Sequence, residues 1–365
     1  MTTKQNARRR APRAKVPRGK MRAVVLTAPR QLHLTERPIP APGEGEVLVR
    51  VQAVGVCGSD VHYYRDGRIG NRVVTGPLVL GHEFAGEVAV AGPGVKGWKV
   101  GTRVAVDPTM PCGECHFCRQ GLIHVCPAVS FCGTPPTDGG YQEFFVTRPA
   151  NLHRLPPGLS TAEGAMVEPL AVAVHAVNLA RLEPGETVAV LGAGSIGLTV
   201  LQVARDRGAR VVLVTEPLPA RRALAKKLGA EQVLDPRETE PLAATLDLTQ
   251  GLGPDVVFEC AGTLETPQQA IDMCRPRGRL LWVGIPPGDT ITLSIHEARR
   301  KELTLVMARR FLATYPQAID LAADHRADLA CLITHRFGLA ETEAAFALVE
   351  QYAEGVIKAI IEPER

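Results

Sequence analysis

Hydrophobic and polar residues alternate along much of the chain between residues 21 and 169. Runs such as EVLVRVQAVGV (46–56) and GEVAVAG (86–92) follow this pattern and are separated by stretches rich in glycine and proline. A period of two is typical of strands with one buried face, and turn residues between such strands favour antiparallel connections. The pattern predicts a mostly β-domain over residues 21–169.

The pattern changes in the second half of the chain, where short apolar runs alternate with helix-compatible sequence. Residues 187–217 read TVAVLGAGSIGLTVLQVARDRGARVVLVTEP, which is an apolar strand, a glycine turn, an amphipathic helix and another apolar strand. Further strands are predicted at 255–259, 278–284 and 302–308. We therefore predict an α/β fold with a six-stranded doubly wound parallel sheet over residues 170–311. Residues 312–365 are too few to fold alone and are expected to return to the first domain.

Three glycines at the first strand-to-helix turn, Gly192, Gly194 and Gly197, form a GxGxxG motif. In a Rossmann fold such glycines allow a tight turn, close approach of a dinucleotide pyrophosphate, and close packing of helix on strand. Glu216 stands nineteen residues beyond Gly197, where a carboxylate would bind the adenosine ribose and repel a 2′-phosphate. The predicted cofactor is therefore NAD rather than NADP. The candidate cofactor-binding residues are Gly192, Gly194, Ser195, Ile196, Gly197, Glu216 and Arg221.

Two arginines near Glu216 bear on this choice. Arg221 and Arg222 would favour a phosphate if they faced the cofactor. Both fall on the predicted next helix, where we expect them to be solvated surface charges. NAD remains the prediction.

The composition is that of a globular protein. The chain has 365 residues, of which 45% are hydrophobic, enough for two domains with separate cores. No apolar run approaches the roughly 20 residues that span a bilayer, and neither a secretory signal nor a transit peptide is recognisable. We expect a cytoplasmic protein that does not contact a membrane.

The basic charge of the chain belongs to its first residues. The formal net charge is +4, but residues 1–20 contain eight Lys or Arg and no acidic residue, and are predicted to be a disordered tail. The tail is either an arm for a nucleic acid or an anionic surface, or it precedes the folded protein, which would open at Met21. We favour the second alternative because a strand-like pattern begins at Met21, and we expect no nucleic-acid partner.

Four cysteines lie close together in CGECHFCRQGLIHVC, residues 112–126. Cys112, Cys115, Cys118 and Cys126 have the spacing of a ligand set, and Zn²⁺ prefers a closed tetrahedral shell of thiolates in structural sites. The alternative is two disulfides or four unconnected thiols. The ligand-like spacing argues against both, and a reducing compartment disfavours the disulfides. A closed shell leaves no position for substrate, so the chemistry must lie elsewhere.

A second set of metal-binding residue types lies upstream of this cluster. The segments GVCGSDVHYYRDGRIG (55–70) and GHEFAGEV (81–88) bring together a thiolate, imidazoles and carboxylates. These groups bind a catalytic zinc, which takes three protein ligands and keeps a fourth position open. The candidates are Cys57, Ser59, Asp60, His62, His82 and Glu83.

These motifs resemble the zinc-dependent medium-chain dehydrogenase/reductase superfamily over nearly all of residues 21–361. Within it the chain is similar to sorbitol (polyol, L-iditol) dehydrogenases, as indicated by CGSDVHYY, GRIGN (67–71), FCGTPPTDGG (131–140) and VEPLAVAVHA (167–176). The resemblance implies a GroES-like catalytic domain, two zinc ions per chain, NAD-dependent oxidation of a polyol to the ketose, and a homo-oligomer, either a tetramer or a dimer.

The resemblance also implies which residues hold the catalytic zinc. Cys57, His82 and Glu83 match ligand positions, and Glu168 stands where many relatives have a cysteine. Glu168 is then a further ligand or a group bonded to the zinc water. Because Cys57 and one carboxylate would neutralise Zn²⁺, we prefer Glu83 as the ligand and Glu168 as the water or substrate contact. Asp60 is expected to orient the unliganded nitrogen of His82.

The same resemblance assigns a proton relay and a substrate channel. Ser59 and His62 match the relay positions; the alternative for His62 is an ordinary surface histidine. Arg310 is expected to bind hydroxyls remote from zinc, and Phe311 replaces a tyrosine common in sorbitol dehydrogenases. The implied channel residues are Tyr63, Phe131, Glu168, Arg310 and Phe311.

Other functions share part of this pattern. L-threonine 3-dehydrogenase and other secondary-alcohol dehydrogenases have the same metal and cofactor motifs, but GRIGN and FCGTPP favour a polyol. A regulatory or nucleic-acid-binding protein that uses the basic tail and the four cysteines would require an impaired catalytic set. Each matched position carries a chemically competent residue instead.

Overall fold

The computed structural model describes residues 16–365. Residues 1–15 of the predicted basic tail lie outside the described residues. The first strand, β1 (Lys20–Ala28), begins next to Met21 and forms an antiparallel hairpin with β2 (Gln31–Pro38).

The segments with alternating hydrophobicity form one large, mostly antiparallel sheet. Its order is β11-β7-β6-β3-β19-β18, and β10 also pairs with β3. The strands are β3 (Val47–Gly55), β6 (Glu83–Ala91), β7 (Arg103–Val106), β10 (Phe144–Thr147), β11 (Leu152–Arg154), β18 (Ile333–Gly338) and β19 (Lys358–Glu362). β19 pairs with β3, so the end of the chain completes the sheet beside a strand from its beginning.

Short strands, helices and 3₁₀ turns accompany this sheet. Two further two-stranded sheets pair β4 (Arg68–Ile69) with β5 (Arg72–Val73), and β8 (Thr109–Met110) with β9 (Ser130–Phe131). The helices are α1 (Gly58–Asp66), α2 (His116–Arg119), α3 (Thr161–Ala165), α10 (Tyr315–Ala323) and α11 (Thr342–Glu350). Single 3₁₀ turns are η1 (Ile123–Val125), η2 (Pro149–Asn151), η3 (Ala330–Leu332), η4 (Leu339–Glu341) and η5 (Ala353–Gly355).

The second half of the chain forms the predicted parallel sheet. Six strands follow the order β14-β13-β12-β15-β16-β17, in which every neighbouring pair is parallel. The strands are β12 (Thr187–Leu191), β13 (Arg210–Thr215), β14 (Gln232–Leu234), β15 (Val256–Glu259), β16 (Arg279–Trp282) and β17 (Thr304–Met307). The helices are α5 (Ser195–Asp206), α6 (Pro219–Lys227), α7 (Pro241–Leu248), α8 (Thr266–Met273) and α9 (Ile295–Arg300). The strand order reverses next to β12, where a doubly wound sheet binds its ligand.

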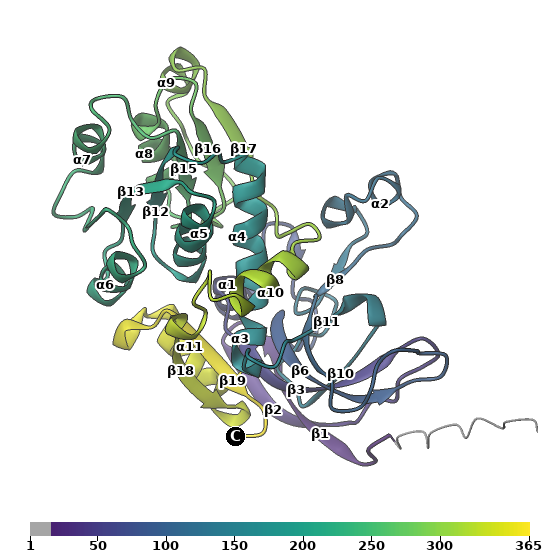
Figure 1. Cartoon of the computed structure of the whole chain (residues 1–365). Helices are drawn as coiled ribbons and strands as arrows, with labels where there is room; N and C mark the ends of the chain where they lie inside the picture. The colour runs from purple at the N-terminus through teal and green to yellow at the C-terminus, as the bar shows by residue number, and fades with distance from the viewer. Residues whose placement is uncertain (1–15) are drawn as a thin grey trace, which may run out of the picture.

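One helix joins the two halves. α4 (Val167–Ala180) lies between the β-rich half and the parallel sheet (Figure 1) and packs against α5 and α10. Its sequence, VEPLAVAVHAVNLA, is apolar almost all round, as expected of a helix buried on every side. A hydrophobic core runs through it from Ala85 of β6 to Val190 of β12. Glu168, in the first turn of α4, is thereby held beside the β-rich half.

Among residues 16–365, no helix combines the length and the apolar character that crossing a bilayer requires.

Candidate active site and metal centres

Strand register brings three potential metal ligands together. Cys57 lies two residues after the end of β3 and caps α1, whereas Glu83 opens β6 and His82 directly precedes it. β3 and β6 pair so that Gly55 lies opposite Glu83. The ligand atoms of Cys57, His82 and Glu83 all lie within 4.8 Å of one another. Gly55 is required here because a Cβ at this position would collide with the Glu83 carboxylate.

A buried aspartate fixes two of these ligands. Asp60 is fully buried, and its Oδ2 accepts hydrogen bonds from the backbone N–H of Cys57 (3.1 Å) and from the hydroxyl of Tyr141 (3.0 Å). Its Oδ1 lies 3.4 Å from Nδ1 of His82. This contact leaves Nε2 of His82 for a metal, as the sequence predicts for Asp60.

The structure adds a charged residue that sequence reasoning missed. Lys358, the first residue of β19, donates from Nζ to both carboxylate oxygens of Glu83, at 2.8 and 2.7 Å. Both side chains are buried, with 2% and 1% of their surface exposed. Lys358 cancels the charge of Glu83, so charge neutrality no longer favours one carboxylate over two beside Zn²⁺. The only signal in the sequence is a lysine at the head of the apolar run KAIIE.

Glu168 lies close to the three ligands without joining them. Its side chain is buried in the first turn of α4, and burial raises the pKa of its carboxyl to about 7, with the positive charge of His82 opposing the shift. Within the described part of the chain, the three-residue ligand group contains Glu83 and not Glu168. A carboxyl that titrates near neutrality can exchange a proton with a bound hydroxyl.

The two predicted relay residues lie on α1 in different surroundings. The hydroxyl of Ser59 donates to Sγ of Cys57 at 3.3 Å, so Ser59 faces the ligand group. His62 is partly exposed, and its Nδ1 lies 3.3 Å from Nη2 of Arg65 and 3.5 Å from Oδ2 of Asp66. Ser59 therefore lies at the site and His62 at its solvent side.

The predicted channel residues divide into two groups. The Phe131 ring lies 5.5 Å from the His82 ring, and the guanidinium carbon of Arg310 lies 3.8 Å from the centre of the Phe131 ring. Tyr63 is buried and interacts with the charges of both His82 and Arg310. Phe311 instead packs against Tyr315 at 5.1 Å, within the hydrophobic core.

The glycine-rich turn has the geometry that its motif predicts. Gly192 has φ of 93°, and a Cβ there would lie 2.8 Å from Cα of Ala261. A Cβ on Gly197 would collide with the carbonyl oxygen of Gly192. Ser195 and Ile196 open α5 directly after this turn, so the N-terminus of the helix faces the place where a pyrophosphate binds in such folds.

Glu216 follows β13 and is 4% exposed. Its Oε2 accepts from the N–H of Ala193 at 2.8 Å, and its Oε1 accepts from the N–H of Leu218 at 3.0 Å. The carboxylate is thus fixed beside the glycine-rich turn and keeps lone pairs for a further donor.

The expectation that Arg221 and Arg222 are solvated surface charges is wrong. Arg221 is buried, and its Nε and Nη2 donate to the carbonyl oxygen of Val356 at 2.9 and 2.6 Å. Its Nη1 lies 3.7 Å from where a Cβ would stand on Gly194, against the glycine-rich turn. Arg222 donates to Oδ2 of Asp235 at 2.8 Å. The α6 helix packs against η5, a contact between distant segments that local charge patterning does not reveal.

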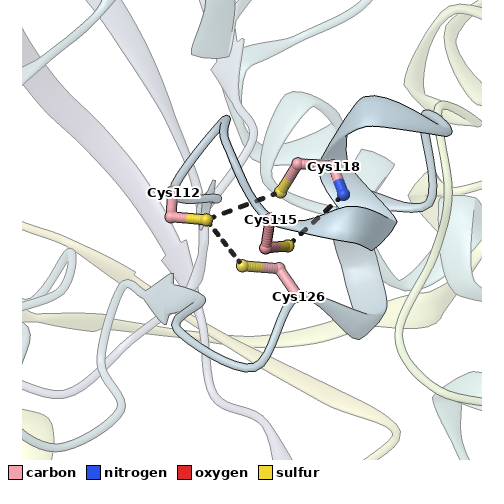
Figure 2. A group of neighbouring side chains, drawn as sticks. All are labelled: Cys112, Cys115, Cys118 and Cys126. Carbon is pink, nitrogen blue, oxygen red and sulfur yellow. Dashed lines mark hydrogen bonds between the residues drawn. The ribbon is translucent and has the colours of Figure 1, made fainter.

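The four cysteines converge as a second candidate metal centre (Figure 2). Sγ of Cys112 lies 3.5 Å from Sγ of Cys126 and 3.9 Å from Sγ of Cys118, and Sγ of Cys115 accepts from the N–H of Cys118 at 3.4 Å. All four sulfur atoms lie within 4.8 Å of one another. Thiolates around tetrahedral Zn²⁺ stand about 3.8 Å apart. The separations fit that shell and are far too long for disulfides.

Family models match both halves of the chain. Residues 43–157 match the "Alcohol dehydrogenase GroES-like domain" and residues 195–324 match "Zinc-binding dehydrogenase". Sorbitol dehydrogenase of Bacillus subtilis is 37% identical over 345 residues, covering 94% of this chain and 98% of that protein. Human sorbitol dehydrogenase is 39% identical over 326 residues, covering 89% and 91%. The chain belongs to the zinc-dependent medium-chain dehydrogenase/reductase family.

Solved structures of this dehydrogenase family agree with the fold. An Escherichia coli oxidoreductase of unknown specificity superposes with a TM-score of 0.90 and 33% identity, covering 94% of this chain and 99% of that one. A Sinorhizobium meliloti enzyme bound to NADP (TM-score 0.88, 31% identity, 94% and 100% covered) and an E. coli enzyme complexed with NADH (0.86, 30%, 94% and 99%) are also similar. The predicted fold class and the classification as an alcohol or polyol dehydrogenase are confirmed.

In this dehydrogenase, Cys115→Ser is expected to remove one zinc and leave the catalytic chemistry intact. The loop CGECHFCRQG has little apolar sequence, so a metal bound there would supply most of its order. We expect one zinc fewer per chain, a lower melting temperature, and turnover per folded active site within a few-fold of the unaltered enzyme. Metal analysis and calorimetry check this, with Cys331→Ser, a cysteine outside the cluster, as the control.

Two results would contradict this assignment of the four cysteines. Unchanged zinc content and melting temperature would show that no structural metal is held there. A variant that stays folded and loses turnover by orders of magnitude would place the loop in the chemistry.

Proposed function

We propose that this dehydrogenase oxidises a secondary alcohol of a polyol, such as sorbitol or xylitol, to the ketose, with NAD as hydride acceptor and zinc as cofactor. The observation that carries the proposal is the convergence of Cys57, His82 and Glu83 at one end of a site whose other end is Arg310. A polyol needs both a group that activates one hydroxyl and a donor that binds the hydroxyls remote from it. The similarity to enzymes named sorbitol dehydrogenase supports the same substrate class.

The donor set at Cys57, His82 and Glu83 suits zinc. Thiolate, imidazole and carboxylate are its preferred ligands, and three of them leave one position open. Zinc bound there would polarise the substrate hydroxyl and lower its pKa. The protein's own part is positional: Asp60 holds the His82 ring, and Lys358 holds the Glu83 carboxylate.

The same residues suggest a path for the alcohol proton. Ser59 lies against Cys57 and can accept the proton from a substrate hydroxyl at the site. His62 lies at the solvent side of α1 beside Asp66 and can pass the proton to water. Loss of this proton leaves the electron pair that expels hydride toward the nicotinamide.

We expect Glu216→Ala to raise KM for NAD about tenfold and to relax discrimination against NADP. The change removes an acceptor for the ribose hydroxyls and a negative charge that repels a 2′-phosphate. Steady-state kinetics with both cofactors measure the change, and Glu231→Ala, an exposed residue in the same half of the chain, is the control. A better kcat/KM with NADP in the unaltered enzyme would show that the cofactor assignment is wrong.

We also propose that the dehydrogenase is a homo-oligomer, either a dimer or a tetramer. β17 is the edge strand of the parallel sheet, and its Leu305 and Met307 are 37% and 65% exposed. An exposed apolar edge strand favours pairing with another chain. Met307→Glu is therefore expected to dissociate the assembly in sedimentation experiments, and an unaltered enzyme that sediments as a monomer would contradict the proposal.

The nine cysteines of the described residues are all free thiols, which supports the proposed cytoplasmic location.

The proposal is tested by NADH formation with a panel of polyols, L-threonine and simple secondary alcohols. Polyols should give the highest kcat/KM because only they offer hydroxyls to both ends of the site. Turnover of threonine alone would favour L-threonine 3-dehydrogenase, the alternative function within the family.

A further inference from the structure

A guanidinium without a hydrogen-bonding partner stands at the remote end of the proposed substrate site. Arg310 stacks on Phe131, whose other neighbour is the His82 ring, so the three side chains form a series that leads away from the metal ligands. Nη1 of Arg310 is buried and has no hydrogen-bond partner among the described residues. Leaving a buried donor without an acceptor destabilises the protein, and more so if the group is charged. Arg310 therefore needs an acceptor from outside the chain.

The charges around Arg310 are mostly of the same sign. Burial lowers the pKa of Arg310 to about 10, and the positive charges of Arg309 and Arg72 act in the same direction. Tyr63 and Glu168 oppose the shift, but Glu168 belongs to the metal end of the site. No carboxylate within residues 16–365 forms an ion pair with Arg310.

Arg72 extends this positive region toward solvent. It lies in β5, is exposed, and has no ion-pair partner within the part of the chain that the structure describes. Its hairpin partner β4 packs against α1, the helix that carries Tyr63. Arg72 therefore lies near the same end of the site, and its charge acts on both Tyr63 and Arg310. The neighbouring arginines differ: Arg65 is paired with Asp66, and Arg68 with Asp289. Among the arginines of this segment, Arg72 keeps its charge uncompensated.

A neutral polyol would satisfy the hydrogen bonds of Arg310 and leave the two charges uncompensated. A carboxylate or a phosphate would satisfy both requirements, because the planar guanidinium fork matches either group with two parallel hydrogen bonds. Hydrogen bonds between charged groups are about twice as strong as neutral ones. The remote end of the site is thus better suited to an anion than to a hydroxyl.

We propose that the substrate is a polyol that carries a terminal carboxylate or phosphate, which Arg310 and Arg72 bind while a secondary hydroxyl lies at Cys57, His82 and Glu83. The inference rests on the proposed function and narrows its substrate class. The reaction is unchanged: the carbinol C–H leaves as hydride to NAD, the O–H proton leaves to solvent, and a C=O bond forms. The anionic group takes no part in it.

The test compares substrates that differ only in the group at one end of the chain: sorbitol, gluconate and sorbitol 1-phosphate, each with NAD at the same pH and ionic strength. We expect kcat/KM for at least one anion to exceed that for sorbitol about tenfold or more. Added salt should raise KM for the anion and leave that for sorbitol nearly unchanged, because only the charged contact is screened. The ratio of kcat/KM for gluconate to that for the phosphate ester shows whether the site prefers a carboxylate or a phosphate.

Substitutions at Arg72 and Arg310 test whether these residues bind the anionic group. Arg72→Gln, at an exposed position, should lower the ratio of anion to sorbitol kcat/KM about tenfold. Arg310→Lys, which keeps the charge and loses the fork, should lower it as well. Arg68→Gln, the matched control with a partner in Asp289, should leave the ratio unchanged.

The outcomes separate this inference from the function on which it rests. Equal or better turnover of sorbitol, with a ratio that Arg72→Gln does not alter, would overturn the anion site and leave the polyol function standing. Turnover of threonine or simple alcohols, with no polyol of either charge accepted, would overturn both.

Discussion

His82→Ala is expected to lower kcat/KM for polyol oxidation by about 10⁴-fold or more. The change removes one of the three proposed ligands of the metal that would activate the hydroxyl, and the ligand group among residues 16–365 contains no second imidazole. Zinc content should fall from about two to about one per chain, because the four-cysteine centre does not include His82. NADH formation and metal analysis of the same preparation measure both effects.

The control for this substitution is His33→Ala, which replaces an exposed histidine on β2. It should change neither activity nor zinc content. Loss of both metals from His82→Ala would show that the two centres are not independent. Full activity of this variant would show that His82 is not part of the active site.

In the enzyme stripped of metal, Lys358→Met is expected to lower the free energy of unfolding by about 3–5 kcal/mol. It leaves the Glu83 carboxylate buried without its partner, and an uncompensated buried charge is costly. Activity should fall as well, since Glu83 loses the contact that holds it beside Cys57 and His82. Denaturant unfolding followed by a spectroscopic signal measures the loss of stability.

Two further variants distinguish the effect of losing the buried ion pair from the effect of losing a lysine side chain. Lys20→Met removes a lysine from an ion pair in which both side chains are more than 60% exposed, and should cost less than about 1 kcal/mol. Adding Glu83→Gln to Lys358→Met should recover much of the stability and none of the turnover. If Lys358→Met lowered the free energy of unfolding no more than Lys20→Met does, the buried ion pair would contribute nothing to stability.

The sequence predicted the fold class well because the relevant signals are local. Alternation of period two marked the strands of the first sheet, and the turn around Gly192 marked the beginning of the parallel one. Six strands were predicted but only five were located, because β14 (Gln232–Leu234) is three residues long and carries no run of apolar residues. Its place in the sheet comes from pairing with β13, which only the folded chain provides.

The candidate site was predictable to the extent that its residues are close in sequence. Cys57 and Asp60 lie within one segment, and His82 follows in a motif of its own. Lys358 lies 275 positions from Glu83 and joins it only because β19 pairs with β3. Arg221 was judged from the polarity of its own helix, whereas its burial depends on Val356 from the end of the chain. The position of Lys358 and the burial of Arg221 both depend on contacts between segments that are far apart in the sequence.

The central claim is that the metal held by Cys57, His82 and Glu83 binds the hydroxyl that is oxidised. A crystal structure of the complex with NADH and a polyol, with anomalous data at the zinc edge, tests it most directly. We predict one anomalous peak among these three residues, with a polyol oxygen as its remaining ligand and the far end of the polyol beside Arg310, and a second peak among the four cysteines. A peak only at the four cysteines, or a polyol bound away from Cys57, His82 and Glu83, would contradict the account.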